Sequence, residues 1–415
     1  MSQLPALVQR AKPQENLDSS PPVVRIQKMI FDEAVAMDAS DIHIEPRQSS
    51  TRVRYRVDGV LRESLEIPSW MHENLVVRIK VLARLDISER RVPQDGHITP
   101  EGSAGSDIRV SIIPTRWGEK IVIRTLRRGR TLMTFAQLGF QAETEERLHG
   151  LIRRPQGILL SVGPTGSGKT TTLYAFVNEI RQEPINIVTI EDPIEYEVDG
   201  VSQVQVNEKT GLTFPRALRA ILRQDPDAIL VGEIRDSDTA VTAFHAAMTG
   251  HLVLSTLHAA DTTSALLRLT ELGVDRPVLS SALIGIVAQR LARINCPACI
   301  GHDFPRPIYL KHLSIQESQQ GLLRQSKGCQ LCKFTGNRGR IGLYELMEIT
   351  PALRAAVLAG SEFDIRQAAR HAGLTSLTRQ AVDLALAGEL SIREAYRACS
   401  FDLSGSECKP DGAQP

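Results

Sequence analysis

Residues 163–170 read Gly163-Pro-Thr-Gly-Ser-Gly-Lys-Thr170, and they fit the phosphate-loop pattern G-x-x-x-x-G-K-[ST] at every position. The residues before this loop, 158–162, are patterned as a buried strand, and residues 171–181 are patterned as a helix. A strand, a glycine-rich turn and a helix N-terminus aim backbone N–H groups at one point, where a polyphosphate can bind. The stretch therefore predicts a nucleoside triphosphate site in an α/β domain. The alternative, a glycine-rich turn without a ligand, is disfavoured by this context.

The whole loop is assigned to the nucleotide. We expect Lys169 to reach the β- and γ-phosphates, and the Thr170 hydroxyl to ligate magnesium. The predicted nucleotide-binding residues are Gly163, Pro164, Thr165, Gly166, Ser167, Gly168, Lys169, Thr170 and Thr171.

The composition is that of an ordinary globular protein. The chain has 415 residues, enough for two or three domains, with 42% hydrophobic and 23% charged residues. Its formal net charge of +1 gives no field that points to nucleic acid, and no apolar run approaches membrane-spanning length. Residues 1–20 lack an apolar secretion segment, which predicts a cytoplasmic chain with reduced cysteines and at most peripheral membrane attachment.

Changes of pattern along the chain predict its domains. Residues 52–57 alternate apolar and arginine side chains before Asp58-Gly59, a strong hairpin signal, and this predicts strands in a small α+β domain. After the phosphate loop, strand and helix patterns alternate, which predicts an α/β domain with a helix-covered sheet. The predicted regions are a flexible lead-in (1–21), an N-terminal α+β domain (22–126), a linker (127–133), a P-loop core (134–295), a four-cysteine element (296–340), a mostly helical C-terminal region (341–400) and a disordered tail (401–415).

Carboxylates follow two predicted strands of the P-loop core. Glu191, Asp192 and Glu195 come at the carboxyl end of one strand, the edge of an α/β sheet where ligands bind. A carboxylate there can position magnesium or orient an attacking water, although acidic surface loops are also common. Residues 228–233, Ala-Ile-Leu-Val-Gly-Glu, resemble a Walker B strand, with glycine where aspartate is common and Glu233 as the acid. The alternative is a buried strand followed by a surface glutamate.

Three more residues carry weaker signals. His258 comes just beyond a predicted strand at residues 252–255, where it could sense the γ-phosphate, although a lone histidine is usually structural. Arg109 and Arg124 lie on late strands of the first domain, and an arginine from another domain or subunit could stabilise charge on the γ-phosphate. From spacing alone, a solvated strand face is the favoured interpretation of both arginines.

Four cysteines form two C-x-x-C pairs, Cys296-Pro-Ala-Cys299 and Cys329-Gln-Leu-Cys332, with twenty-nine residues between the pairs. Each pair can bind one metal ion, and four thiolates close a tetrahedral zinc site. The alternatives are a disulfide pair, which is disfavoured in the cytosol, and four free thiols. The spacing favours zinc held by Cys296, Cys299, Cys329 and Cys332, and with no open ligand position its role would be structural.

Taken together, the motifs resemble one family, the secretion ATPases that drive type II secretion and type IV pilus assembly. The resemblance runs in order from about residue 22 to residue 397. Besides the phosphate loop, the four-cysteine element, the aspartate box at 189–195, residues 228–235 and the histidine box ending at 258, the matching stretches are Ser40-Asp-Ile-His-Ile-Glu-Pro46, Arg54-Tyr-Arg-Val-Asp-Gly59, Pro93-Gln-Asp-Gly96, Arg109-Val-Ser111 and Gly339-Arg-Ile-Gly-Leu-Tyr-Glu345.

The resemblance implies a RecA-like P-loop ATPase domain, a smaller PAS-like N-terminal domain and a homo-hexamer that uses ATP, Mg2+ and Zn2+. Each site would lie between the nucleotide domain of one chain and the first domain of another. On this carry-over, Glu195 is the catalytic carboxylate, Glu233 supports magnesium and water, and His258 contacts the γ-phosphate region. Arg109 and Arg124 match the arginine fingers of the family, which reverses the interpretation from spacing alone.

The resemblance also implies a partner. Domain rotation would turn hydrolysis into work on an inner-membrane platform protein that helps to add pilin-like subunits to a filament, so the chain would be cytoplasmic and peripheral at the inner membrane. The four-cysteine element favours an assembly motor over the related retraction motors, which usually lack it. Two departures stand out. About twenty residues precede the first matched helix, where relatives often carry a large docking domain, and His97 stands where arginine is usual.

Two other functions fit parts of the sequence. A nucleic-acid translocase of similar ring design is the alternative, but the near-neutral charge and the lack of a basic groove studded with aromatic residues argue against direct nucleic-acid binding. A non-hydrolysing zinc-bearing scaffold would not need the intact set of Lys169, Thr170, Glu195 and Glu233.

Overall fold

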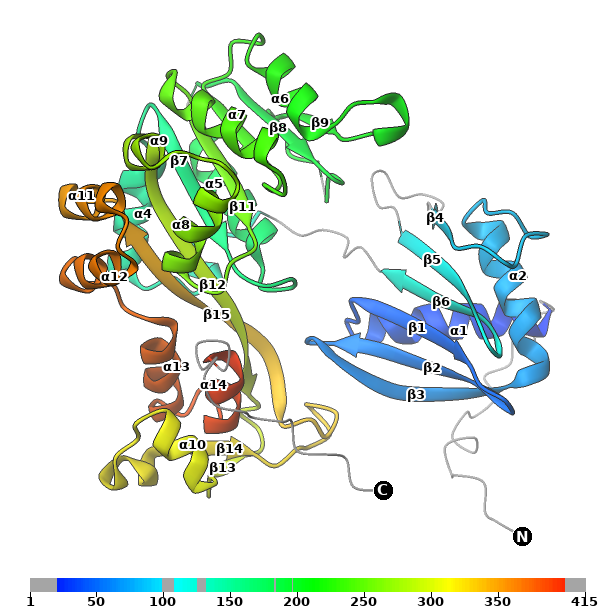
Figure 1. The fold of residues 1–415 in the computed structure, drawn as a ribbon. Coiled ribbons are helices and arrows are strands. Elements are labelled where there is room, and N and C mark those ends of the chain that lie inside the picture. Colours follow the sequence, from blue (N-terminus) through cyan, green and yellow to red (C-terminus); the bar gives the residue numbers. More distant parts are fainter. Residues whose placement is uncertain (1–20, 99–107, 125–131, 183, 196, 400–415) are drawn as a thin grey trace. The chain divides into compact units, whose positions relative to one another are not determined.

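The computed structural model describes residues 21–98, 108–124, 132–182, 184–195 and 197–399 (Figure 1). The predicted lead-in (1–21), linker (127–133) and tail (401–415) fall almost entirely outside these described residues. By its internal contacts the chain divides into two compact units, residues 1–128 and 129–415. Each unit is described by itself below.

The first unit is a six-stranded antiparallel sheet with two helices. Its strands stand in the order β3-β2-β1-β6-β5-β4, and each neighbouring pair is antiparallel. The elements are α1 (Pro22–Ala36), β1 (Asp41–Pro46), β2 (Ser50–Val57), β3 (Val60–Pro68), a 3-10 turn (Ser69–Met71), α2 (His72–Leu82), β4 (Gln94–Ile98), β5 (Ile108–Thr115) and β6 (Gly118–Arg124).

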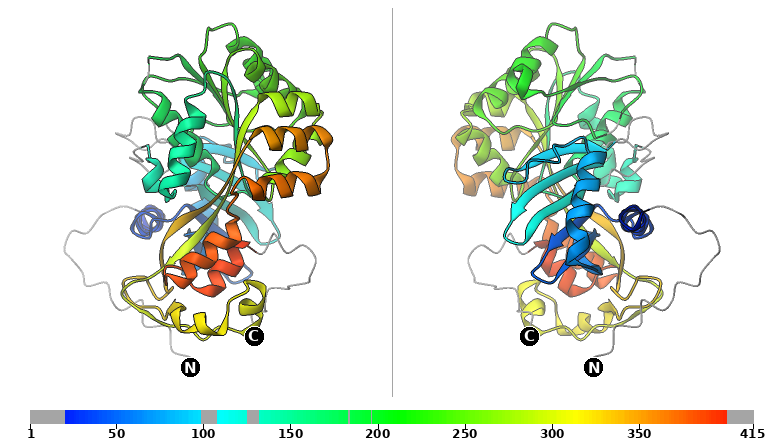
Figure 2. Two further views of the ribbon diagram at one scale, coloured as in Figure 1. Left: turned by 90° about the vertical axis from the view of Figure 1, so that its left-hand side faces the viewer. Right: turned by 90° about the vertical axis from the view of Figure 1, so that its right-hand side faces the viewer.

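One face of this sheet is apolar because the side chains of its strands alternate. On β2 the buried Val53 and Tyr55 face the core, and the arginines between them face the other way. The apolar face packs against Ile30 of α1 and Ile79 of α2 (Figure 2). The hairpin signal at Asp58-Gly59 is confirmed, since both residues have positive φ and join β2 directly to β3. The opposite, polar face carries the charged side chains.

The second unit is built on a seven-stranded sheet in the order β15-β12-β7-β11-β10-β8-β9. All neighbours are parallel except the edge strand β15, which is antiparallel to β12. The strands are β7 (Gly157–Val162), β8 (Ile187–Glu191), β9 (Ser202–Gln205), β10 (Ala228–Val231), β11 (Leu252–Leu257), β12 (Leu283–Asn295) and β15 (Asn337–Glu348).

Helices cover both faces of this sheet, which is why its central strands are buried along their whole length. On one face the core contains Leu159 and Leu254 with α4 and α5; on the other it contains Leu160 and Val253 with α6 to α9. The helices are α3 (Phe135–Leu138), α4 (Ala142–Ile152), α5 (Lys169–Ile180), α6 (Phe214–Ile221), α7 (Ser237–Met248), α8 (Thr262–Glu271) and α9 (Arg276–Ala282), with a 3-10 turn at Glu208–Thr210.

The C-terminal part differs from the sequence-based expectation in one respect. Residues 341–348 were expected in a mostly helical region, but they belong to β15, which pairs with β12 over most of its length. The segment is extended because residues 342–347 are buried on both faces, between β12 and the helices that follow. Helices begin only at residue 351: α11 (Pro351–Ala359), α12 (Glu362–His371), α13 (Leu377–Leu386) and α14 (Ile392–Cys399).

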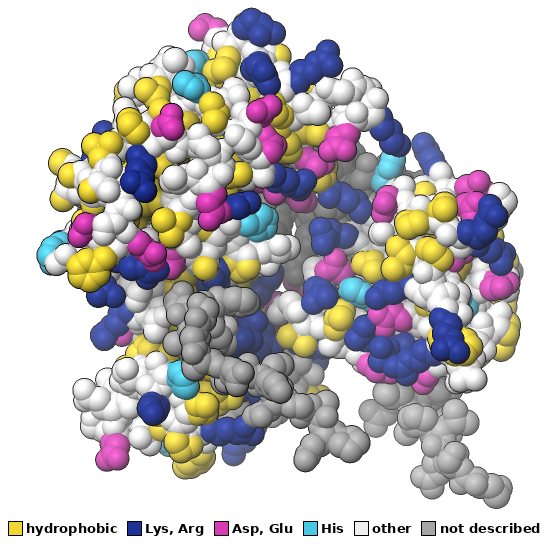
Figure 3. Space-filling model, in the orientation of Figure 1, with side chains coloured by type: hydrophobic (Ala, Val, Ile, Leu, Met, Phe, Trp, Pro, Cys, Tyr) yellow, Lys and Arg dark blue, Asp and Glu magenta, His cyan; other side chains and the backbone are white. Residues whose placement is uncertain are grey.

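The segment between β12 and β15 forms a small element of its own. It contains β13 (Ile300–His302), α10 (Pro307–His312), a 3-10 segment (Glu317–Leu322) and β14 (Arg324–Ser326), and β13 pairs with β14. Within the described ranges, no helix is long and apolar enough to cross a membrane. Basic and acidic side chains are interspersed over the visible face of each unit (Figure 3), in keeping with the net charge of +1.

Candidate nucleotide site and four-cysteine element

The phosphate loop lies between β7 and α5, at the carboxyl edge of the parallel sheet. Gly168 has a φ of +93° directly before α5, and this backbone conformation is strained for any residue that has a side chain. A side chain at Gly163 would bring its Cβ to 2.6 Å from the carbonyl oxygen of Gln289. Both positions therefore need glycine. The sharp turn that they allow leaves the first N–H groups of α5 available to a ligand. Thr170, the predicted magnesium ligand, is exposed in the first turn of this helix.

Lys169 is buried beside the loop and already bonded to it. Its Nζ donates to the carbonyl oxygens of Gly163, at 2.9 Å, and of Pro164, at 3.1 Å. Burial lowers the pKa of Lys169 to about 8; the carboxylate of Glu233 opposes this shift and the guanidinium of Arg290 adds to it. The ammonium thus sits where phosphate oxygens would be better partners than neutral carbonyls.

The neighbouring strand β12 braces the loop, and this brace was not predicted from the sequence. Ala288 of β12 pairs with Val162, the last residue of β7, so Gln289 reaches past the end of β7. Its Oε1 accepts from Ser161 Oγ, and its Nε2 donates to the carbonyl oxygen of Ser167, both at 2.8 Å. The available signal was the polar pair Gln289-Arg290 inside an otherwise mostly apolar strand.

Of the three carboxylates predicted at the carboxyl end of β8, Asp192 is exposed beside Arg235, whereas Glu191 and Glu195 differ in their surroundings. Glu191 is buried and accepts hydrogen bonds from the Tyr174 hydroxyl, the Thr189 hydroxyl and the Gln203 amide, at 2.5 to 3.1 Å. A carboxylate saturated in this way is held as part of the structure. Glu195 is half-buried, and among the described residues it has no polar side-chain partner. Of the two, Glu195 is the one that is available to a water molecule or an ion.

The acid of the Walker B-like strand lies in a charged cluster with His258. Glu233 forms an ion pair with Arg235, and its Oε2 lies 3.8 Å from His258 Nε2. Burial and the charge of Lys169 lower the pKa of His258, the Glu233 carboxylate opposes the shift, and Arg235 adds to it. Lys169, Glu233 and His258 therefore belong to one electrostatic cluster at the carboxyl edge of the sheet, and the lowered pKa favours the neutral form of the imidazole.

Arg109 and Arg124 both lie in the first unit. They stand directly opposite each other on the neighbouring strands β5 and β6, so their side chains share the polar face of that sheet. The Arg124 guanidinium is largely exposed, and its Nε lies 3.2 Å from Asp41 Oδ1. Sequence spacing could not show this direct pairing, and the role of the two arginines at a nucleotide site stays a prediction.

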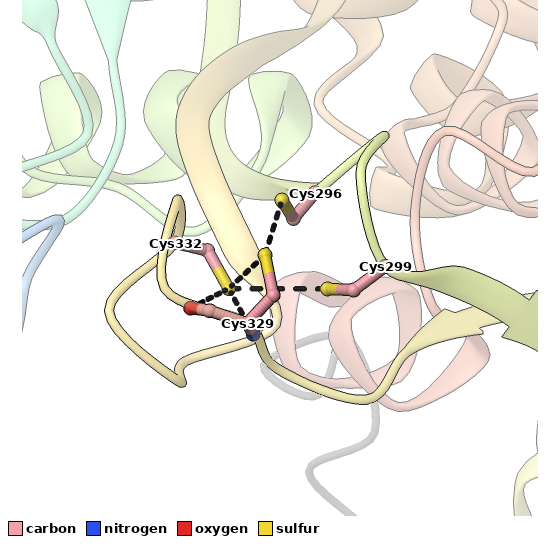
Figure 4. A group of neighbouring side chains, drawn as sticks. All are labelled: Cys296, Cys299, Cys329 and Cys332. Atoms are coloured by element: carbon pink, nitrogen blue, oxygen red, sulfur yellow. Dashed lines mark hydrogen bonds between the residues drawn. The ribbon is translucent and has the colours of Figure 1, made fainter.

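The four cysteines converge at the base of the segment between β12 and β15 (Figure 4). Their sulfur atoms all lie within 4.8 Å of one another, with contacts of 3.8 to 3.9 Å between Cys329 and Cys332, Cys296 and Cys329, and Cys299 and Cys332. A tetrahedron with zinc–sulfur bonds of about 2.3 Å has edges of about 3.8 Å. These separations fit four ligands of one ion and are far longer than a disulfide bond of about 2.05 Å.

Backbone N–H groups support the same sulfur atoms. Cys329 N and Gly336 N donate to Cys332 Sγ at 3.1 and 3.3 Å, and Gly328 N donates to Cys299 Sγ at 3.3 Å. Desolvation raises the pKa of Cys332, but hydrogen bonds from the N–H groups of Cys329 and Gly336 and from the Cys329 and Cys299 thiols outweigh it and lower that pKa to about 6. Desolvation raises the pKa of Cys299 to about 11. In the absence of a metal ion, Cys332 is therefore the cysteine that favours the thiolate form, and Cys299 favours the thiol.

Residues 16–397 match the family model "Type II/IV secretion system protein". The chain is 43% identical over 390 residues to "Type II secretion system protein E" of Aeromonas hydrophila, covering 93% of this chain and 77% of that protein. It is 44% identical over 371 residues to "Type IV pilus assembly ATPase PilB" of Thermus thermophilus, covering 88% of this chain and 42% of that protein.

A solved structure agrees with the sequence relatives. The crystal structure of the pilus retraction motor PilT with bound ADP superposes with a TM-score of 0.62 at 28% identity, covering 89% of this chain and 95% of that chain. The matched family model spans nearly the whole described part of the chain, and it includes every site residue assembled above. The chain therefore belongs to the family of type II/IV secretion system proteins.

Proposed function

We propose that this chain is an ATPase that hydrolyses ATP to ADP and phosphate to drive assembly of a type II secretion pseudopilus or a type IV pilus. The Thermus thermophilus relative is named as an ATPase, and the phosphate loop, buried lysine and Walker B-like acid supply a site that fits this activity. The observation that carries the proposal is the convergence of Lys169, Glu233 and His258 beside the phosphate loop at one edge of the parallel sheet.

The residues fit ATP and Mg2+. The phosphate loop would receive the phosphates, with Lys169 leaving its carbonyl partners for phosphate oxygens, and the exposed Thr170 hydroxyl would be the protein ligand of the metal. Magnesium would neutralise charge between the β- and γ-phosphates. The phosphate loop itself is preorganised by Gln289, so its N–H groups need no large rearrangement to receive an anion.

Glu195 is the proposed catalytic carboxylate. It is half-buried at the carboxyl edge of the sheet without a polar partner among the described residues, so it can accept a hydrogen bond from the attacking water. Glu233, held by Arg235 and near His258, would support the metal and its water. The neutral His258 would donate or accept a hydrogen bond near the γ-phosphate without adding a positive charge.

The remaining parts of the proposal rest on family membership. Arg109 and Arg124 would act as arginine fingers toward the site of a neighbouring chain in a homo-hexamer, and their adjacency on one sheet face would let both reach the same phosphates. Hydrolysis would act on an inner-membrane platform protein, with the motor cytoplasmic and peripheral at that membrane. The four cysteines would hold a structural zinc ion.

Replacement of one carboxylate tests the catalytic assignment. In Glu195→Gln we expect the rate of ATP hydrolysis to fall at least about 100-fold while the dissociation constant for ATP changes less than about threefold. Glu197→Gln, an exposed carboxylate in the same segment, is the matched control and is expected to keep full turnover. Full turnover in Glu195→Gln would remove Glu195 from the mechanism. Wild-type protein that binds no ATP would overturn the proposed function.

A further inference from the structure

Glu345 lies in the stretch of residues 339–345, to which the proposed function gives no task. It stands on β15 opposite Ala288 of β12 and is 7% exposed. Its Oε1 accepts two hydrogen bonds from one residue: from Thr262 N at 3.2 Å and from Thr262 Oγ1 at 2.6 Å. Thr262 is fully buried and is the first residue of α8, where a carboxylate is favoured by the helix dipole.

The residues before Thr262 are fixed as well. Arg290 of β12 donates from Nη2 to the carbonyl oxygen of Ala260 at 2.8 Å, and Asp261 caps α8 by accepting from Ser264 N at 2.6 Å. Residues 260–262 are thus tied to the paired strands β12 and β15 at two points. His258 lies just two residues earlier on the same connection, so its position depends on how firmly this connection is held.

The same strand pair also holds the phosphate loop. Gln289, the neighbour of Arg290, bonds to Ser161 and to the Ser167 carbonyl, so one short stretch of β12 contacts both the phosphate loop and the connection after His258. A common support fixes the distance between two parts of a site better than two separate supports would. Strands β12 and β15 therefore help to position both the phosphate loop and the connection that carries His258.

We propose that Glu345 is a positioning residue for hydrolysis: through Thr262 it holds the connection that carries His258 at a fixed place relative to the phosphate loop. The inference deepens the proposed function and rests on it. The effect of Glu345 is on the rate of the chemical step, because a displacement of a reacting or polarising group by about 1 Å can lower a rate about 100-fold.

The test is a double-mutant cycle with a matched control. Glu345→Met, which keeps the length of the side chain but removes the acceptor oxygen, is expected to lower kcat at least about tenfold with the dissociation constant for ATP within about twofold. If Glu345 acts through His258, then adding Glu345→Met to His258→Ala lowers kcat by less than about twofold further. The control is Glu348→Met on the same strand. Glu348 contacts Arg154 and Arg147 instead, so this variant is expected to keep wild-type kcat in both backgrounds.

Three further measurements separate positioning from a general loss of structure. Thr262→Val removes the hydroxyl donor and is expected to lower kcat, whereas Thr262→Ser restores most of it. Hydrogen exchange at residues 258–262, which needs no activity, is expected to accelerate in Glu345→Met and not in Glu348→Met. Unchanged exchange, or fully multiplicative effects of Glu345→Met and His258→Ala, would overturn the inference. Absence of hydrolysis by the wild type would instead overturn the proposed function, and the inference with it.

Discussion

The nucleotide site and the four-cysteine element both lie beside strand β12. They differ in how far their functional groups are already arranged around one another. At Gln289 the strand braces a loop whose key groups are available: Lys169 rests on neutral carbonyls and Glu195 has no polar partner within the described residues. A few residues on, β12 ends at Asn295, and the next residue is the first of four cysteines whose sulfur atoms face one another. Backbone N–H groups donate to two of these sulfurs, those of Cys299 and Cys332. The groups of the nucleotide site are therefore available to a ligand that binds and leaves. The four sulfur atoms are already arranged around one point, where a bound ion would stay.

The largest effect is expected at the exchangeable site. In Lys169→Ala the rate of hydrolysis should fall at least about 1,000-fold, about 4 kcal/mol, because the buried cation for the phosphates is gone. The free energy of unfolding should not fall, since a buried ammonium on two carbonyls is a poor stabiliser. Turnover assays and chemical denaturation measure both. A variant that hydrolyses ATP within about tenfold of wild type would contradict the assignment of the site.

At the four-cysteine element we expect the opposite result: a substitution should lower stability and leave ATP binding almost unchanged. Wild-type protein is expected to contain about one zinc ion per chain, and Cys329→Ser should lose it and melt at least about 5 °C lower. The dissociation constant for ATP should change less than about threefold. Cys399→Ser, a buried thiol on α14 outside the cluster, is the control and should keep its metal. A folded wild-type chain that binds no zinc would contradict the assignment of the four cysteines as a zinc site.

Between the two sites, β12 is fastened to α14 by a buried ion pair. Glu394 is almost fully buried and accepts from Arg293, at 2.7 to 3.1 Å, and from Arg397 Nε at 2.9 Å. Burial by itself would raise the pKa of Glu394, but the hydrogen bonds from Arg397 and Arg293 outweigh it and lower that pKa to about 2. Removing the carboxylate in Glu394→Gln should lower the free energy of unfolding by about 3 kcal/mol near pH 7.

The pH dependence of this loss follows from the sign of the shift. A carboxylate with a lowered pKa contributes its stability above the unfolded value of about 4.5, and loses it as pH falls toward about 2. The difference between wild type and Glu394→Gln should therefore shrink between pH 5 and about 2. Glu271→Gln, at an exposed pair with Arg268, should cost less than about 0.5 kcal/mol at any pH. A difference that is constant over this pH range would refute the ion-pair explanation.

The smallest effect concerns the backbone of the second cysteine pair. Lys333 has a φ of +52°, which disfavours a side chain by about 1 kcal/mol. Lys333→Gly should raise the free energy of unfolding by about 0.5 kcal/mol, because relief of this strain exceeds the added freedom of the unfolded chain. Lys327→Gly, at an exposed position without positive φ, should lower it by a similar amount. Equal effects of the two substitutions would mean that the conformation at Lys333 carries no strain.

The parts of this molecule that were predictable from sequence depend on local spacing. The phosphate loop needs eight consecutive residues, and each cysteine pair needs four, so their conformations follow from short patterns. The brace by Gln289 was not predictable, because it depends on how β12 pairs with β7 more than a hundred residues away. The comparison of the first unit with PAS domains stays a prediction.

Spacing alone could not separate the roles of similar residues. Glu191 and Glu195 are four positions apart in one acidic stretch, and the family resemblance assigned catalysis to Glu195. The structure adds that Glu191 is buried and accepts from three donors. Residues 341–348 were expected in a mostly helical C-terminal region, and their pairing with β12 makes them a strand. Tertiary partners, absent from any short pattern, determine both outcomes.

The most direct test of the central claim, an ATPase whose site is completed by arginines of another chain, is turnover per chain against protein concentration for the wild type and for Arg109→Ala. We expect wild-type turnover to rise with concentration, and we expect Arg109→Ala to bind ATP without showing this rise. Turnover that is independent of both concentration and Arg109 would contradict the shared site and remove the arginine-finger assignment.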